Sequence, residues 1–308
     1  MSPAIAVPHD VTLAPKRAPF SVDSTIIEKY KRDGYVIIRG VFSRDEVAEM
    51  RRLAMLQVDE DKRDNLTRDD VRKGFLMSKL DMLSNRHLRA VLFDDRILVI
   101  ARALLAPHPI VYFGNAVYNI GFNRRAWHRD NVDRDYDLSA PDWQDEYRLI
   151  NIGLYLQDHS EHSGGLKVRV GSHANISGPP FQLDTKAGDV AIWNLRLIHS
   201  AATIRLRFAP KFPYLPPQTH RKRGHFVSEN NLPTWLQIPE EVTPRIAFFM
   251  CFGVKGPHLD RFISKYMAGV PALRETFAMC RFGPEVWEMA ERKGVTIVPP
   301  VPEYGASP

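Results

Sequence analysis

The feature that most constrains this chain is a run of short segments rich in β-branched and aromatic residues, which occupies its middle and last third. Gly, Pro, Ser or Asp residues bound each segment, and several segments alternate apolar with polar residues, as half-buried strands do. Strands that follow one another this closely favour one β-rich core. The expected strands are 34–42, 110–122, 147–158, 164–173, 188–199 and 245–254.

Helical patterns come before and after this run, and the first third of the chain reads as mainly helical. Ser43 is followed three residues later by Glu46, which is a capping box at the start of a helix. Pro107 and Pro109 end another helical region. We therefore expect helices packed outside the β core. The expected helices are 24–33, the one beginning at Ser43, 85–105, 258–268 and 284–293.

Length and composition narrow the class of protein. A chain of 308 residues is long enough for one large domain or two; we expect a flexible arm over residues 1–20 and a single domain over 21–308. No apolar run approaches the length of a transmembrane segment. Two cysteines without a CxxC pair favour a reducing cytoplasm. The net charge of +6 fits a small anionic substrate better than nucleic acid, which we do not expect as a partner.

Residues 205–244 interrupt the rhythm of strands. This proline-rich segment holds the basic cluster "HRKRGH" at 220–225. A loop of this length inside a compact domain is usually functional, often a lid, or else disordered. Its cations, Lys211, Arg221, Lys222 and Arg223, would suit a negatively charged substrate, but a solvated charged loop is the alternative.

Metal ligation is the chemistry that the histidines suggest. Two residues i and i+2 on a strand point to the same side, so a histidine and an acid two apart can both bind one ion. With 11 histidines and 36 acidic residues, chance gives about one such pair. Spacing alone therefore does not choose among the pairs. Three are present: His128/Asp130, His159/Glu161 and His258/Asp260.

Context favours His128 and Asp130, which lie between two expected strands. His199 ends a later strand and can supply a third ligand. Three protein ligands with open positions on one face are the arrangement of non-haem Fe(II) oxygenases. His159 and Glu161 read as a solvated turn, and Asp260 as a charge near a helix N-terminus. Taken singly, each histidine has a commoner interpretation than metal ligation: a surface loop residue for His128, and a buried residue with a backbone partner for His199.

Four blocks of sequence resemble the phytanoyl-CoA dioxygenase-like (PhyH) family of Fe(II)- and 2-oxoglutarate-dependent oxygenases. Together they span most of residues 25–255, and their order is more specific than any one block. The third departs from the family pattern, because Val170 stands where proline is usual. The blocks are "YKRDGYVIIRGVFSRDEVAEMR" (30–51), "WHRD" (127–130), "EHSGGLKVRVGSH" (161–173) and "AGDVAIWNLRLIHSA" (187–201).

The resemblance implies a double-stranded β-helix, a jelly roll of the cupin kind, flanked by helices. It implies His128, Asp130 and His199 as iron ligands, and Fe(II), 2-oxoglutarate and O₂ as cofactor and cosubstrates. The expected reaction is oxidation of an unactivated C–H bond in a small molecule, with release of succinate and CO₂. Iron halogenases that resemble this family lack the carboxylate, so Asp130 favours hydroxylation, desaturation or ring closure.

The family also uses an arginine at the start of its final strand to pair with the far carboxylate of 2-oxoglutarate. Arg205 and Arg207 lie near the usual spacing after the distal histidine, but the proline-rich segment follows them. We interpret 205–244 as an insertion and expect Arg245 to take this role. Asn119 is a second candidate for holding the cosubstrate, with an edge-strand amide as the alternative. Trp193 is expected to pack in the core.

Lys167 and Arg169 would add positive charge to the site if they point inward.

Two other kinds of protein are also compatible with the sequence. A zinc or manganese isomerase or hydrolase can use three ligands on the same barrel, but it needs no arginine clamp. A protein that binds anionic surfaces through 220–225 would lose binding at modest salt concentrations.

Overall fold

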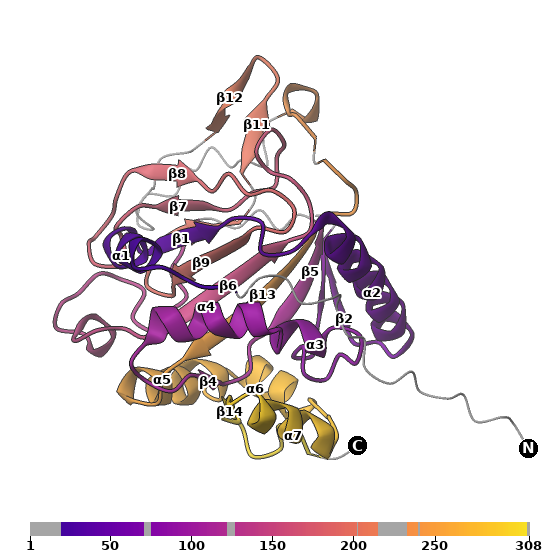
Figure 1. Ribbon diagram of the computed structural model, residues 1–308, viewed down its shortest axis with the longest axis vertical. Coiled ribbons are helices and arrows are strands. Elements are labelled where there is room, and N and C mark those ends of the chain that lie inside the picture. Colours follow the sequence, from indigo (N-terminus) through magenta and orange to yellow (C-terminus); the bar gives the residue numbers. More distant parts are fainter. Residues whose placement is uncertain are drawn as a thin grey trace, which may run out of the picture.

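Two mainly antiparallel sheets form the centre of the computed structural model, which describes residues 20–70, 75–121, 127–201, 203–214, 233–239 and 241–306. The larger sheet has the order β1-β9-β6-β13-β5-β3-β2, and β4 and β14 extend it beside β13 (Figure 1). Its strands are β1 (Tyr35–Ile38), β2 (Thr67–Asp70), β3 (Phe75–Ser78), β4 (Val111–Tyr112), β5 (Val117–Gly121), β6 (Leu149–Tyr155), β9 (Val190–Asn194), β13 (Ile246–Gly253) and β14 (Thr296–Ile297).

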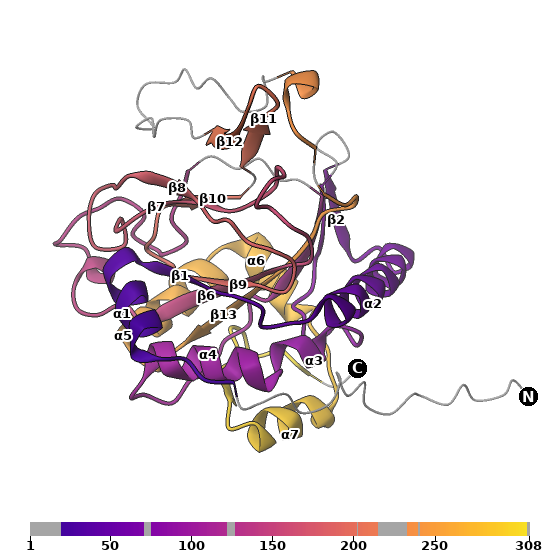
Figure 2. The same ribbon diagram turned by 45° about the horizontal axis from the view of Figure 1, so that its top comes forward.

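A smaller sheet, β10-β7-β8, lies beside the large one, and a separate hairpin projects beyond it (Figure 2). The chain enters the smaller sheet after β6 and returns to the large one at β9. The strands of the smaller sheet are β7 (Lys167–Arg169), β8 (Pro180–Gln182) and β10 (His199–Ser200), and those of the hairpin are β11 (Ile204–Leu206) and β12 (Ala209–Tyr214).

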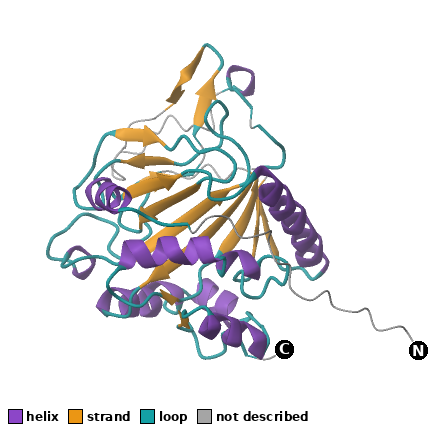
Figure 3. Cartoon of the chain, in the orientation of Figure 1, coloured by secondary structure: helices purple, strands orange, loops and turns teal. Residues whose placement is uncertain are grey.

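Helices cover the other face of the large sheet, with α4 lying across it and the C-terminal helices below (Figure 3). The α-helices are α1 (Ser24–Asp33), α2 (Arg44–Arg63), α3 (Arg89–Leu92), α4 (Asp95–Leu105), α5 (Pro257–Arg261), α6 (Pro271–Ala278) and α7 (Pro284–Arg292). A π-helical turn, η5 (Phe262–Met267), continues α5, and 3₁₀ turns lie at η2 (Pro141–Trp143) and η4 (Thr234–Leu236).

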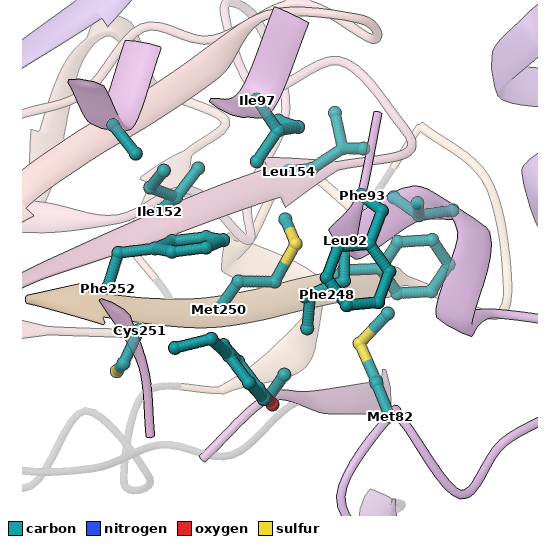
Figure 4. Packing of buried hydrophobic residues seen from close by; sticks show 14 of the residues in the cluster. Met82, Leu92, Phe93, Ile97, Ile152, Leu154, Phe248, Met250, Cys251 and Phe252 are labelled. Atoms are coloured by element: carbon teal, nitrogen blue, oxygen red, sulfur yellow. The ribbon is translucent and has the colours of Figure 1, made fainter. Parts of the chain in front are cut away.

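Alternate residues of the central strands serve two different cores. Phe248 and Met250 of β13 pack against α4 and its neighbours in the larger core (Figure 4). Ala247, the residue before Phe248, faces the smaller core that the two sheets enclose. The smaller core consists of Tyr35, Tyr155, Leu166, Val168, Leu183, Ala191, Trp193, Leu197 and Ala247. The prediction of a mainly β, jelly-roll core with helices outside it is confirmed.

Three expected elements are interrupted, each for a local reason. The strand 110–122 breaks where Gly114 and Asn115 take positive φ angles of 78° and 76°. The strand 188–199 turns after Asn194, whose Oδ1 accepts a hydrogen bond from the backbone N–H of Arg196 at 2.9 Å. The helix 85–105 divides at Asp94, which caps the N-terminus of α4. The turn after Asn194 carries His199 from the large sheet to the small one.

The hairpin β2–β3 was not expected, because the first third of the chain was interpreted as mainly helical. Residues 67–70, "TRDD", have low β propensity, and it is pairing with β5 that fixes this hairpin at the edge of the sheet. Residues 205–214 were expected as loop but form most of the hairpin β11–β12, and a bridge joins Leu206 to Gln237. The basic cluster 220–225 and the arm up to residue 19 lie outside the described residues.

In the described part of the chain, no helix is both long enough and apolar enough to cross a membrane.

The capping box of α2 is present as predicted. Ser43 Oγ accepts from the Glu46 backbone N–H at 3.2 Å, and the Glu46 carboxylate accepts from the Ser43 N–H at 2.7 Å.

Replacing Ser43 with alanine should lower the free energy of unfolding by about 1 kcal/mol, since one N–H at the helix start loses its acceptor. Urea denaturation of Ser43→Ala beside the wild type measures this change. Ser264→Ala is the matched control, because Ser264 is exposed and its hydroxyl makes only a 3.4 Å contact within the helix. Equal midpoints for Ser43→Ala and Ser264→Ala would contradict a stabilising role of the cap.

Candidate metal centre

Backbone pairing joins the segment of His128 and Asp130 to the turn between the two sheets. The N–H of His128 donates to the carbonyl of His199 at 3.0 Å, and the N–H of His199 donates back at 2.9 Å. Two residues on, the N–H of Asp130 donates to Leu195 O at 2.9 Å. His128 and His199 are 71 residues apart in the sequence, and their segments thus lie side by side in antiparallel pairing.

Arg129 anchors this segment from the opposite side, because its side chain points away from those of its two neighbours. It is buried, and its guanidinium donates to the carbonyls of Arg196 at 2.8 Å and Asn175 at 3.0 Å, among others. Burial lowers the pKa of Arg129 to about 10, which still leaves it charged at neutral pH. The sequence did not single out this residue, since nothing distinguished it from the other arginines nearby.

The side chains of His128, Asp130 and His199 meet at one point. One ligand atom from each lies within 4.8 Å of the other two. Asp130 Oδ2 is 3.2 Å from His199 Nε2, and Asp130 Oδ1 is 3.6 Å from His128 Nε2. Two imidazole nitrogens and one carboxylate oxygen are a donor set that suits divalent iron, zinc or manganese. Among the described residues, no other group of His, Cys, Asp and Glu meets this condition.

The orientation of His199 fits ligation through Nε2. Its Nδ1 lies 3.0 Å from the carbonyl oxygen of Leu197. Because a carbonyl only accepts, this contact places the ring proton on Nδ1 and directs the Nε2 lone pair toward Asp130. His199 is buried, while His128 and Asp130 are partly exposed, so the group is accessible from one side.

That side opens into a cavity of about 360 Å³. Its wall combines polar side chains near the three candidate ligands with apolar side chains farther along. Trp193 is buried in the smaller core, as predicted, and also lines the cavity. The described lining residues are Arg68, Phe75, Met77, Asn115, Val117, Asn119, His128, Asp130, Asn151, Leu166, Trp193, His199, Ala201, Phe249, Phe262, Tyr266 and Leu273.

Asn119 lines the cavity from β5, on the same face as Asn115 and Val117. Its Oδ1 is buried without a hydrogen-bond partner in the described part of the chain, and the same is true of Asn151 Oδ1 on β6, which also lines the cavity. A buried amide oxygen without a donor is costly, so both sites suit a bound polar molecule. Asn151 was not singled out from the sequence, because a lone Asn in a strand carries no signal. A role of Asn119 in holding the cosubstrate remains a prediction.

Arg245 lies in the interior between the sheets. It immediately precedes β13 on the face that carries Ala247 and Phe249, and it is only 2% exposed. Its Nε donates to Gly164 O at 2.9 Å, and its guanidinium lies 5.3 Å from the centre of the Tyr155 ring. The structure does not bring Arg245 into the wall of the cavity itself. Its inward position is nevertheless the one expected for a carboxylate partner at the start of the final strand.

The competing arginines lie on the projecting hairpin. Arg205 is buried rather than solvated, and its guanidinium donates to Pro210 O at 2.9 Å within the same hairpin. Arg207 is exposed. Neither lines the cavity that holds the candidate metal ligands. The choice among the three arginines remains a prediction, and the structure gives Arg245 the interior position.

The other His-x-acid pairs do not form comparable sites. The interpretation of His159 as part of a solvated turn is wrong, because its ring is completely buried beside Tyr155 and contacts Thr185 and Gln157. Burial, and next the nearby charge of Arg245, lower the pKa of His159 well below its ordinary value. Asp260 lies exposed in the first turn of α5, as expected.

Among the expected sources of extra positive charge, the residues that the structure describes do not line the cavity of the candidate site. Val168 faces the smaller core, so Lys167 and Arg169 point to the opposite side of β7. There their cationic groups lie 5.4 and 4.6 Å from the centre of the Trp127 ring. Lys211 is exposed on the hairpin, and Arg221, Lys222 and Arg223 lie outside the described residues.

A rolled pair of antiparallel sheets that presents two histidines and one acid to a cavity defines a class of protein, the jelly-roll enzymes with a three-residue metal site. The model of the family described as phytanoyl-CoA dioxygenase (PhyH) matches residues 30–205, more than half of the chain. The chain belongs to the PhyH family, and the resemblance seen in the four sequence blocks is confirmed. The match ends at Arg205, so Arg245 lies beyond it.

Curated relatives include ectoine dioxygenases from two bacteria. The one from Stutzerimonas stutzeri (strain A1501) is 26% identical over 167 residues, covering 51% of this chain and 52% of the relative. The one from Sphingopyxis alaskensis is 28% identical over 149 residues, covering 47% of each. The chain thus spans about half the length of the curated relatives that it matches.

Solved structures with some likeness include HygX from Streptomyces hygroscopicus with nickel and 2-oxoglutarate bound, at 15% identity, a TM-score of 0.49 and coverage of 76% of this chain and 88% of that one. EctD from S. alaskensis with 2-oxoglutarate and 5-hydroxyectoine has 17% identity, a TM-score of 0.48 and coverage of 80% and 81%.

Proposed function

We propose that this protein is an Fe(II)- and 2-oxoglutarate-dependent dioxygenase that oxidises a C–H bond of a small molecule and releases succinate and CO₂. The observation that carries the proposal is the meeting of His128, Asp130 and His199 at one wall of a cavity. Membership of the PhyH family and the likeness to ectoine dioxygenases support the same chemistry.

The three side chains would hold the metal as a neutral pair of imidazoles and one carboxylate. When bound, Fe(II) with 2-oxoglutarate and O₂ supplies the oxidising chemistry, while the protein supplies ligand geometry and a sheltered site. Leu197 O keeps the Nε2 atom of His199 directed at the metal position. Arg129 fixes the backbone between the other two ligands from the far side. The site therefore needs little rearrangement to accept an ion.

Arg245 would bind the far carboxylate of 2-oxoglutarate, and Asn119 would donate to or accept from the bound cosubstrate. A buried guanidinium is suited to this role, because its planar donors match both oxygens of a carboxylate. A cosubstrate reaching from the metal ligands to Arg245 would pass Phe249 and Ala247, which share its face of β13.

The presence of Asp130 supports hydroxylation or a related C–H oxidation such as desaturation or ring closure. The likeness to ectoine dioxygenases favours hydroxylation of a small polar molecule. Cys251 and Cys280 are both free and buried. Reduced thiols fit the cytoplasmic location that we propose.

Anaerobic titration of the purified protein with Fe(II) and then 2-oxoglutarate tests the proposal. We expect a weak visible charge-transfer band that requires both additions, and succinate formation once O₂ is admitted. Zn(II) in place of Fe(II) should bind without giving the band or succinate. Hydrolase or isomerase turnover with Zn(II) or Mn(II), in the absence of any 2-oxoglutarate-dependent signal, would instead favour a non-oxygenase metal enzyme.

A further inference from the structure

Part of the cavity wall serves neither the candidate metal ligands nor the proposed cosubstrate site. Five of the described lining residues come from elements on the side of the hairpin β2–β3 and the C-terminal helices. They are apolar or aromatic, and they face the same space as the candidate ligands. These residues are Phe75 and Met77 of β3, Phe262 and Tyr266 of η5, and Leu273 of α6.

Arg68 lines the same cavity as these apolar side chains and is itself exposed, so it lies at the edge of the cavity that faces solvent. It lies on β2 opposite Met77 and is the one Lys or Arg that lines the cavity within the described residues. Its Nη2 donates to Thr276 Oγ1 of α6 at 2.6 Å, and that hydroxyl donates to Ala272 O at 2.9 Å. This contact uses one of the five N–H donors of the guanidinium and leaves the others for a ligand in the cavity.

We propose that Arg68 binds an anionic group of the substrate, and that the substrate is a small organic acid with an apolar body. This inference rests on the proposed function and names the substrate class of the same site. A planar guanidinium pairs with a carboxylate through two parallel hydrogen bonds. The aromatic and aliphatic wall around it favours an apolar body between the anion and the oxidised carbon.

The size and charge of the site agree with this substrate class. A cavity of about 360 Å³ lies near the lower end of the range for small-molecule sites, roughly 300–1,000 Å³, and it must also admit part of the cosubstrate. The net charge of +6 favours approach of an anion. A purely structural role for Arg68, in which it only ties β2 to α6 through Thr276, would give no preference for an anion.

The test uses the anaerobic protein with Fe(II) and saturating 2-oxoglutarate, and it measures binding of matched probes by titration calorimetry. The probes are 3-phenylpropanoate with 3-phenylpropanamide, and hexanoate with hexanamide; each pair has the same shape and differs in charge. In the wild type, we expect at least one carboxylate to bind about tenfold more tightly than its amide, as a charged hydrogen bond provides. Arg68→Gln should remove that preference and leave amide binding unchanged.

Three further variants distinguish anion binding by Arg68 from a structural tie and from binding at Arg245. Arg274→Gln removes an exposed positive charge from the same helix as Thr276 and should keep the preference. Thr276→Val should also keep it, whereas a structural tie would make Thr276→Val and Arg68→Gln equivalent. If Arg245→Gln removes the preference and Arg68→Gln does not, the probe occupies the cosubstrate site and the proposal is wrong.

The proposal also fails if no carboxylate binds more tightly than its amide, whether both bind equally or neither binds. Binding of the probes does not depend on turnover, so this outcome is distinct from failure of the proposed function. That function is judged by the charge-transfer band and by succinate formation without any probe.

Discussion

Replacing Asp130 with alanine should lower 2-oxoglutarate turnover by roughly 10³-fold or more. Loss of a mere outer-shell partner of a metal ligand costs about 10–100-fold in metal affinity or activity, and Asp130 is itself one of three candidate ligands. Its carboxylate oxygens lie 3.2 and 3.6 Å from the two histidine nitrogens, so no other acid in the described structure can take its place. Succinate formation and Fe(II) affinity are the two measurements.

The fold should survive this change, since Asp130 is partly exposed and its segment is held by backbone hydrogen bonds that the substitution keeps. Asp260→Ala is the matched control, because Asp260 has the same spacing from a histidine but lies exposed at the start of α5. It should keep full turnover. Asp130→Ala protein with wild-type turnover and Fe(II) affinity would end the proposed mechanism, provided that both variants melt as the wild type does.

The candidate metal ligands could be predicted only in part from the sequence. Three His-x-acid pairs were equal in spacing, and His128 and Asp130 were favoured by their position between expected strands and by the order of the family blocks. The structure distinguishes this pair from the other two, because antiparallel pairing of His128 with His199 brings the three candidate ligand atoms together. The burial of His159 was missed, since the polar segment around it reads as a turn and its partner Thr185 comes from a distant part of the chain.

The outer wall of the cavity could not be predicted from the sequence. Arg68 lies in a polar segment whose strand forms only because β3 pairs with β5, and such pairing depends on tertiary contacts rather than on local propensity. Its partner Thr276 is 208 residues away. The strands of the core were more predictable, because alternating apolar residues such as those of β13 specify both faces of the sheet at once.

The choice of Arg245 over Arg205 depended on treating 205–244 as an insertion, and the structure gives a physical basis for testing it. Arg205 is held by a carbonyl of its own hairpin, whereas Arg245 points between the sheets at the start of β13. Because β13 pairs with β5 and β6, Arg245 shares the sheet that carries Asn119. Arg205 and Arg245 therefore carry the same functional group, but only Arg245 points between the two sheets.

Replacing Arg245 with glutamine should raise the KM for 2-oxoglutarate by roughly 30- to 5,000-fold, because loss of one partner of a buried charge pair costs about 2–5 kcal/mol. A second cosubstrate makes the test specific. 2-Oxopentanoate has the length of 2-oxoglutarate but lacks the far carboxylate. The wild type should strongly prefer 2-oxoglutarate, while Arg245→Gln should use the two keto acids with similar KM. Loss of packing alone would weaken both and keep the preference.

Arg205→Gln provides the matched control, since it removes a second buried arginine without touching the interior of the barrel. We expect it to keep the preference for 2-oxoglutarate, whatever it does to stability. If the preference instead disappears in Arg205→Gln and survives in Arg245→Gln, the final strand of the family corresponds to β11 and not to β13. The interpretation of 205–244 as an insertion before the final strand would then have to be abandoned.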